Sequence, residues 1–269
     1  PYEYGVGSDS IKPILGSLQT LAPRASIGGG SNNHIPGGRN ARIGGGTENV
    51  ISGTTDGGIL SGYRNVITQS QQSSIGGGRM NTIGTSTLSA QWSFIGGGYE
   101  NDIKGSYGYN FIGGGSGNRL GTSAFAVGQG WSTIGGGSSN SIYGPYLTYS
   151  TIGGGVENMI TGSSQSFLGG GDHNILTGDS GSVLVGGYYN TMKSSLRSFI
   201  GGGANNELHD GQYNTIVGGF NHHINNSGNN NFIGGGDSNI LGDIGGEGLN
   251  TDFSSILGGK SNQIAGDGT

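Results

Sequence analysis

Carboxylates are the residues of this sequence that could support catalysis. Glycan-cleaving enzymes hold two carboxyl groups about 5 to 9.5 Å apart. Glu48, Glu100 and Glu157 share one position of a sequence repeat, but three repeats separate each from the next, about 14 Å at 4.8 Å per repeat. Asp210 and Asp243 are two repeats apart, about 9.6 Å. The spacing favours solvated surface charge, and we predict no enzyme, with a polysaccharide depolymerase as a minor alternative.

Metal and cofactor chemistry has little support in the residue pattern. Gly259-Lys260-Ser261 is similar to the end of a phosphate-binding loop, but Ser254 stands where that motif requires glycine. The chain has no cysteine, and its histidines show no zinc-binding spacing. These histidines are His34, His173, His209, His222 and His223. We therefore predict no metal site and no cofactor.

The composition is dominated by glycine, with 64 glycines in 269 residues. The net charge is −5 and the 11 Lys and Arg residues are scattered, which argues against nucleic acid as a partner. No apolar run approaches the roughly 18 residues of a membrane span, so we predict no membrane insertion. Such a glycine content is typical of low-complexity segments unless the glycines keep a period that also fixes the apolar residues.

The glycines do keep a period. Fourteen units follow the template Ser/Asn-x-φ-Gly-Gly-Gly-x-x-Asn-x-φ, in which every φ is Ile, Leu or Met. The basic spacing is 16 residues, and the two φ residues of a unit are eight apart, as in Ile27, Ile35, Ile43 and Ile51. An even spacing keeps these side chains on one face of a strand. The pattern predicts an all-β fold, a flattened parallel β-solenoid of about 14 coils of two strands each.

The remaining columns of the template predict how the coils are built. The asparagine recurs in thirteen of fourteen units, with His222 as the exception, and predicts a hydrogen-bonded Asn ladder along the axis. The third glycine of each triplet is invariant, which predicts a turn with positive φ. The first glycine is sometimes a larger residue, so we expect it to mark the close approach of another backbone, that of a neighbouring chain.

An outward apolar stripe lies beside this first-glycine column. We expect it to be the interface of a homo-oligomer, most simply three parallel copies, because a stripe of this kind is poorly suited to water. The interface residues are Phe94, Phe111, Phe167, Val183, Phe199, Phe232, Leu60, Val185, Val217 and Leu257.

Aromatic residues re-enter the coils after the loop insertions that interrupt the 16-residue spacing. The column holds Trp92, Tyr109, Trp131, Tyr149, Tyr213 and Phe253, and Tyr143, Tyr146 and Phe125 are expected on nearby loops. The rings could cover the insertions or a neighbouring chain. Alternatively they form stacking platforms for sugar rings, with Trp92, Tyr109, Trp131, Tyr146, Tyr149 and Phe253 as candidate glycan-binding residues.

The repeat resembles the head repeats of trimeric autotransporter adhesins, and similar repeats occur in phage tail fibres. The segment Ser93-Phe94-Ile95-Gly96-Gly97-Gly98-Tyr99-Glu100-Asn101-Asp102-Ile103 carries the resemblance, which covers about residues 24–268. It implies a left-handed, homotrimeric β-roll exposed at a cell or virion surface and acting in adhesion. This chain departs from the family in its 16-residue unit and its Asn column.

The sequence thus predicts a cap or docking segment over 1–23 and a solenoid domain over 24–269. The expected function is that of an extracellular adhesive or receptor-binding fibre component, whose partners are copies of itself and a host-surface polysaccharide or receptor. The alternative is a structural subunit of an extracellular filament that polymerises end to end through open strand edges.

Overall fold

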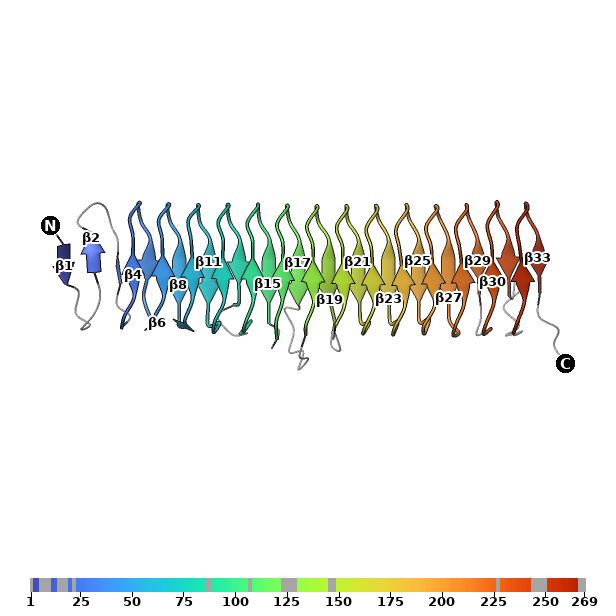
Figure 1. Ribbon diagram of the computed structural model, residues 1–269, viewed down its shortest axis with the longest axis horizontal. Helices are drawn as coiled ribbons and strands as arrows, with labels where there is room; N and C mark the ends of the chain where they lie inside the picture. The colour runs from blue at the N-terminus through green and yellow to red at the C-terminus, as the bar shows by residue number, and fades with distance from the viewer. Residues whose placement is uncertain are drawn as a thin grey trace. The chain divides into compact units, whose positions relative to one another are not determined.

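The computed structural model describes residues 2–4, 11–13, 19–20, 23–85, 89–105, 108–121, 130–144, 149–225, 228–242 and 251–265. These residues form short strands and turns and no helix (Figure 1). Contacts divide the chain into two units, Pro1–Ser139 and Asn140–Thr269. Each unit is a parallel β-solenoid, which confirms the predicted all-β class and parallel-solenoid architecture.

Unit 1 contains two sheets and a small strand pair. The first sheet has the order β1 (Tyr2–Tyr4), β2 (Ile11–Pro13), β4 (Ser26–Ile27), β7 (Arg42–Ile43), β10 (Gly58–Ile59), β12 (Ser74–Ile75), β14 (Phe94–Ile95), β16 (Phe111–Ile112) and β18 (Thr133–Ile134). The second has the order β3 (Gln19–Thr20), β5 (His34–Ile35), β8 (Val50–Ser52), β11 (Val66–Thr68), β13 (Thr82–Ile83), β15 (Asp102–Lys104) and β17 (Arg119–Gly121). The pair is β6 (Gly38–Arg39) with β9 (Thr54–Thr55).

Unit 2 repeats the same arrangement. Its first-sheet strands are β20 (Thr151–Ile152), β22 (Phe167–Leu168), β24 (Val183–Leu184), β26 (Phe199–Ile200), β28 (Thr215–Ile216), β30 (Phe232–Ile233) and β32 (Ser255–Ile256). Its second-sheet strands are β19 (Ser141–Tyr143), β21 (Met159–Thr161), β23 (Ile175–Thr177), β25 (Thr191–Lys193), β27 (Glu207–His209), β29 (His223–Ile224), β31 (Ile240–Leu241) and β33 (Gln263–Ile264).

The N-terminal segment departs from the repeat. Strands β1 and β2 pair antiparallel, whereas β2 pairs parallel with β4. Strand β3 also pairs parallel with β5, with Thr20 opposite Ile35. The two sheets of unit 1 therefore already include strands from within residues 1–23.

The core lies between the two sheets of each unit. Equivalent residues pair one turn apart, for example Ile43 with Ile59 in the first sheet and Ile51 with Ile67 in the second. The φ side chains are buried, with Ile264 of the last described strand as the exposed exception. Strand parity thus places the aliphatic columns as predicted.

Each turn of the solenoid has two corners. We call the corner from the first sheet to the second the glycine corner, because it contains the Gly triplet, and the corner that leads to the next turn the return corner. The third glycine of every triplet has positive φ, between 84° and 116°. The turn predicted from its invariance is confirmed.

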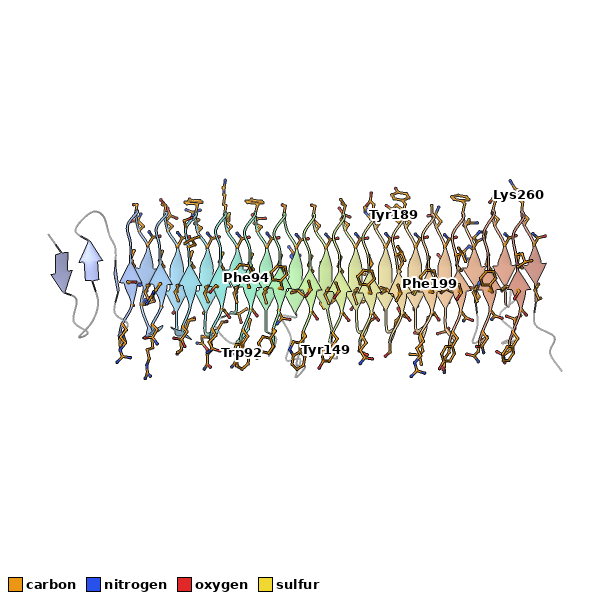
Figure 2. The ribbon with its side chains drawn as sticks, in the orientation of Figure 1. Trp92, Phe94, Tyr149, Tyr189, Phe199 and Lys260 are labelled. Carbon is orange, nitrogen blue, oxygen red and sulfur yellow. The ribbon has the colours of Figure 1, made fainter. Side chains whose placement is uncertain are left out.

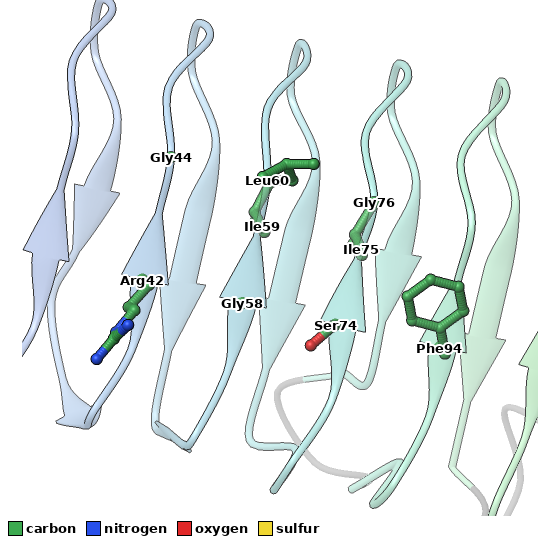
Figure 3. A pocket seen from close by; sticks show the side chains of 9 residues that line it. All are labelled: Arg42, Gly44, Gly58, Ile59, Leu60, Ser74, Ile75, Gly76 and Phe94. Carbon is green, nitrogen blue, oxygen red and sulfur yellow. The ribbon is translucent and has the colours of Figure 1, made fainter.

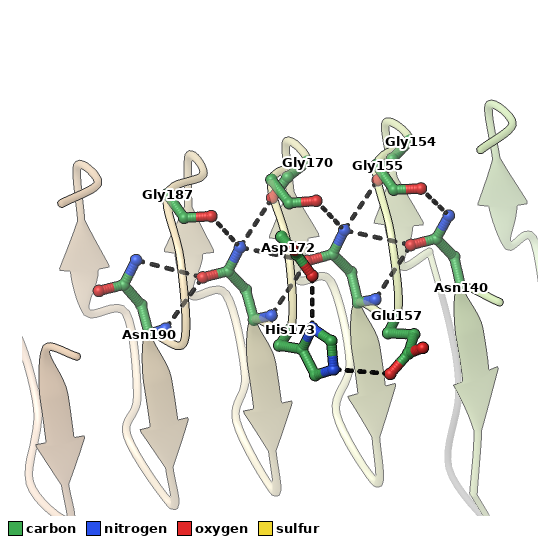
Figure 4. Close-up of polar contacts among 12 residues, drawn as sticks. Asn140, Gly154, Gly155, Glu157, Gly170, Asp172, His173, Gly187 and Asn190 are labelled. Carbon is green, nitrogen blue, oxygen red and sulfur yellow. Dashed lines mark hydrogen bonds and ion pairs between the residues drawn. The ribbon is translucent and has the colours of Figure 1, made fainter. Parts of the chain in front are cut away.

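The Asn column forms the predicted ladder inside the glycine corner (Figure 4). The backbone N–H of Asn174 donates to Asn158 Oδ1 at 3.0 Å, and its Nδ2 donates to the same oxygen at 3.1 Å. Nδ2 also donates to the carbonyls of Gly170 and Gly187 at 3.0 and 2.9 Å. Asn190 makes the equivalent bonds to Asn174 Oδ1. Each side chain thus satisfies both its own amide and the backbone of the corner.

Candidate functional site

The predicted aromatic column lies on the return corner, where the backbone turns towards the next first-sheet strand. The backbone φ is positive at Trp92 (50°), Tyr149 (59°), Tyr213 (57°) and Phe253 (54°). Left-handed backbone is unfavourable by about 1 kcal/mol or more for residues with a side chain, and glycine, Asn and Asp adopt it most readily. Large rings at these positions therefore occupy a backbone conformation that other residues adopt more easily.

Three rings of this column form a contiguous ridge in unit 1. Trp92 and Tyr109 stack at a centroid distance of 5.4 Å, and Tyr109 and Trp131 at 6.1 Å, with interplanar angles of 21° and 15°. The exposed fractions are 40%, 55% and 37% for Trp92, Tyr109 and Trp131. Tyr109 therefore has a ring against each face, and the ridge presents ring edges to solvent along most of its length.

The end of the ridge nearest the N-terminus is fixed by a polar contact. The indole Nε1 of Trp92 donates to Gln72 Oε1 on the preceding turn. The backbone N–H of Trp92 donates to Gln71 O at 2.9 Å. Figure 2 shows Trp92 projecting from the return corner, away from the sheets.

In unit 2 the rings of the same column are separated by polar residues. Tyr213 receives a hydrogen bond of 2.5 Å from Arg197 Nη1, whose Cζ lies 5.7 Å from the ring centroid. Tyr149, labelled in Figure 2, and Phe253 are exposed at their own turns. Tyr213 is thus held by an arginine of the preceding turn rather than by a second ring.

The loop residues expected to extend the column are placed differently. Tyr143 belongs to β19 and donates its hydroxyl to the Met159 sulfur at 3.0 Å, so its expected position on a loop is wrong. It projects from the second sheet because it is the outward residue of a strand. Tyr146 and Phe125 lie outside the described residues.

The apolar stripe projects from the first sheet. Phe94 and Phe111 stack at 5.8 Å and are about two-fifths exposed. Leu60 is 71% exposed. The other interface candidates, which lie in unit 2, are exposed or half-buried. They are Phe167, Val183, Val185, Phe199, Val217, Phe232 and Leu257.

A groove of about 470 Å³ interrupts this stripe in unit 1, where Phe is absent from the column (Figure 3). Leu60 and Phe94 are the large exposed apolar side chains that line it, and Ile59 and Ile75 also contribute to its lining. Gly58 is among the remaining residues that line it. The groove exists because the outward residues between the two large side chains are small.

Glycine is favoured at the first position of the triplet for a different reason from the one expected. A Cβ added at Gly28 would lie 2.4 Å from Gly44 O, and one at Gly96 would lie 2.2 Å from Gly113 O. The approaching backbone is the next turn of the same chain. The expectation that this column marks a neighbouring chain is wrong, and the exposed Phe, Leu and Val side chains remain as the support for an interface on this face.

A cluster of titratable residues lies on the glycine corner of unit 2 (Figure 4). His173 Nε2 lies 2.6 Å from Glu157 Oε2, and His173 Nδ1 contacts Asp172 Oδ1. The hydrogen bond with Asp172, followed by the attraction of Glu157, raises the pKa of His173. The imidazole also stacks on Tyr189 at 4.7 Å. Both carboxylates are thus engaged by one histidine.

In the described part of the chain, no group of three or more His, Asp or Glu residues could hold a metal ion. His222 and His223 point to opposite faces of strand β29 and its approach. His222 is buried in the Asn column, and His223 Nδ1 lies 3.3 Å from Glu207 on the outer face. No helix with the length and apolar character of a membrane span occurs among the described residues.

Sequence reasoning missed a second aromatic row, on the glycine corner of unit 1. Tyr63, Arg79 and Tyr99 succeed one another there on three consecutive turns. The signal was available, since each of the three directly follows the third glycine of its triplet.

Known proteins do not identify the chain. No family model matches it, and a search of curated proteins finds no significant match.

Proposed function

We propose that this chain is an adhesive, receptor-binding component of an extracellular fibre and that it binds a host-surface glycan through the return corner. The observation that carries the proposal is the exposed ridge of Trp92, Tyr109 and Trp131. Contiguous exposed apolar surface of this kind is uncommon on a protein without a partner. Aromatic side chains contribute large contact areas at little cost in conformational entropy.

The scaffold suits a polymeric ligand. Rings on consecutive turns repeat along one direction, at 5.4 and 6.1 Å, and a polysaccharide also presents its apolar CH groups at repeating intervals. The Asn ladder and the parallel strands hold each turn in register, so the ridge is formed before the ligand arrives. Pre-organisation of this kind lowers the entropy lost on binding.

The proposal includes a homotrimer of left-handed solenoids at a cell or virion surface. The exposed stripe of Phe94 and Phe111 on the first sheet supports association of copies along this face. The number three, the handedness and the surface location rest on the resemblance to autotransporter head repeats. Light scattering of the full chain tests the association, and a monomer would contradict it.

The binding experiment is a glycan array probed with the full chain and with Trp92→Ala and Trp131→Ala. We expect each substitution to reduce binding by about fivefold to tenfold, since an exposed ring edge contributes on the order of 1 kcal/mol of buried apolar contact and the two end rings support Tyr109. Gln165→Ala, at the same corner position in unit 2, is the matched control and should bind as the parent does. Light scattering must show the same oligomer for all variants.

Other results would favour one of the alternative functions. Absence of binding to any glycan or to host cells would overturn the adhesive proposal. Fibres that lengthen with protein concentration under the electron microscope would favour the filament subunit in its place. Release of reducing sugars from host polysaccharide would favour the depolymerase and overturn the non-enzymatic function proposed here.

A further inference from the structure

We infer that the glycine corner of unit 1 carries a second binding site, which takes a carboxylate-bearing saccharide and is centred on Arg79. Arg79 Cζ lies 5.5 Å from the ring centroid of Tyr63 and 5.6 Å from that of Tyr99. The guanidinium therefore lies between two aromatic rings contributed by the preceding and following turns.

The backbone holds these three residues in register. Tyr63 bridges Arg79, and Arg79 bridges Tyr99, through parallel backbone pairing. Their N–H groups donate to the carbonyls of Gly78, Gly98 and Gly115 at 2.8 to 2.9 Å. The spacing of the ring, cation and ring is thus set by the solenoid rather than by side-chain flexibility.

The neighbouring charges leave Arg79 without a carboxylate partner in the described part of unit 1. Arg64 Nε pairs with Glu48 Oε2 at 2.5 Å. The Glu100 carboxylate hydrogen-bonds the Tyr99 hydroxyl, and this bond is the main cause that raises the pKa of Tyr99. In the described part of unit 1 the Arg79 guanidinium contacts two rings and no carboxylate, so its planar set of N–H donors is available to a ligand.

The chemistry of the corner selects the ligand. A planar fork of N–H donors matches a carboxylate, with which it can form two parallel hydrogen bonds. The adjacent ring of Tyr99, exposed to solvent, offers a contact for the CH face of a sugar. A single unpaired cation, in a protein of net charge −5, does not provide the basic cluster that a nucleic acid requires. An acidic saccharide combines the two features that the corner can recognise.

This inference rests on the proposed function in one respect, that the ligand is a surface saccharide. Its residues are separate from the ridge, because Arg79 lies on the glycine corner and Trp92 on the return corner. Failure of one site can therefore be told from failure of the other.

The test is titration of the full chain with polygalacturonate and with fully methyl-esterified polygalacturonate, which lacks the charge. We expect the acidic polymer to bind at least tenfold more tightly. Arg79→Gln should remove about tenfold of that affinity, as expected for a hydrogen bond to a charged group. Arg79→Lys should recover only part of it, because an ammonium group lacks the planar fork.

Arg39→Gln is the matched control, since it removes one exposed arginine charge from the return corner of the same unit. It should bind as the parent does. Equal losses for Arg39→Gln and Arg79→Gln would show unspecific charge attraction and overturn the site. Equal binding of both polymers, or no binding of either, would overturn it as well. Arg79-dependent binding of poly-L-glutamate as tight as that of polygalacturonate would overturn the saccharide class in favour of an acidic peptide.

Discussion

Asp179 Oδ1 accepts a hydrogen bond of 2.5 Å from the backbone N–H of Ser195, which lies one turn further along unit 2. The other carboxyl oxygen, Oδ2, is buried and has no partner among the described residues. Asp179 stands inside the return corner between Ser163 and Ser195. These two serines donate their hydroxyls to Thr161 O and Lys193 O, two residues earlier in the chain. Only a protonated Asp179 could donate in the same way.

Burial raises the pKa of Asp179 to about 7, against an unfolded value near 3.8. The neutral form is therefore favoured by the fold, and its stabilising effect is complete below about pH 4 and is lost as the pH rises towards 7. We expect Asp179→Ser to remove this pH dependence and to raise the free energy of unfolding at pH 8 by about 2 to 4 kcal/mol. Thermal unfolding between pH 4 and 8 measures it. Asp210→Ser, at an exposed corner, should keep the parent's slope.

The dependence of folding stability on pH that we expect from His222 has the opposite sign to that of Asp179. Its Nδ1 accepts the backbone N–H of Asn239 at 3.1 Å, and burial lowers its pKa from the usual value of about 6.5. The stability that the neutral ring contributes is present above pH 6.5 and is lost as the pH falls below that value. His222→Asn, which restores the residue of the ladder, should abolish this loss. Unchanged acid unfolding in His222→Asn would contradict the assignment, and His34→Asn is the control.

Removing one asparagine of the ladder should be costly. Asn174→Ala leaves the Gly170 and Gly187 carbonyls and the Asn190 amide without their side-chain partner. The Asn190 amide is buried and would lose its acceptor, whereas Gly187 O keeps the bond from the Asp172 N–H, so we expect a loss of about 1 to 3 kcal/mol. Urea unfolding measures the loss. Thr191→Ala, on the outer face of β25, should change stability by less than about 1 kcal/mol.

Adjacent glycines should respond differently to alanine. A Cβ at Gly46 would lie 2.1 Å from Gly62 O, on a backbone with φ of 90°, whereas a Cβ at Gly45 would have no atom within 4 Å. Gly46→Ala should therefore destabilise the chain by more than about 2 kcal/mol, while Gly45→Ala should be nearly neutral. The pair of unfolding curves provides the comparison. A large effect at Gly45 would point to a neighbour on that surface.

The sequence was sufficient for features that follow from strand parity. Ile43 and Ile59 are buried and paired, and Asn33 accepts from Asn49, because an even spacing returns a residue to the same face of a strand. The contacts of Tyr109 could not be predicted in this way. They depend on the orientation of the Trp92, Tyr109 and Trp131 rings at the return corner, which strand parity does not determine.

Two other features that the sequence did not predict also depend on contacts between neighbouring turns. Glycine is favoured at the first position of most triplets because a Cβ there would clash with a carbonyl oxygen of the next turn. The distance between that Cβ and the oxygen cannot be read from the residue pattern. The pairing of Arg64 with Glu48, which leaves Arg79 uncommitted, depends on the side-chain positions of three consecutive turns.

The register of the Asn ladder makes the length of this protein adjustable in whole turns. Residues 167–182 begin and end at equivalent positions, so their excision would join Ser166 to Val183 as Ser182 is joined now. Asn190 would then take the place of Asn174 against Asn158, with the same bonds available. Duplication of such a segment would add one turn with equal ease. A change in the number of turns would therefore alter the length of the solenoid without altering the pattern of its core.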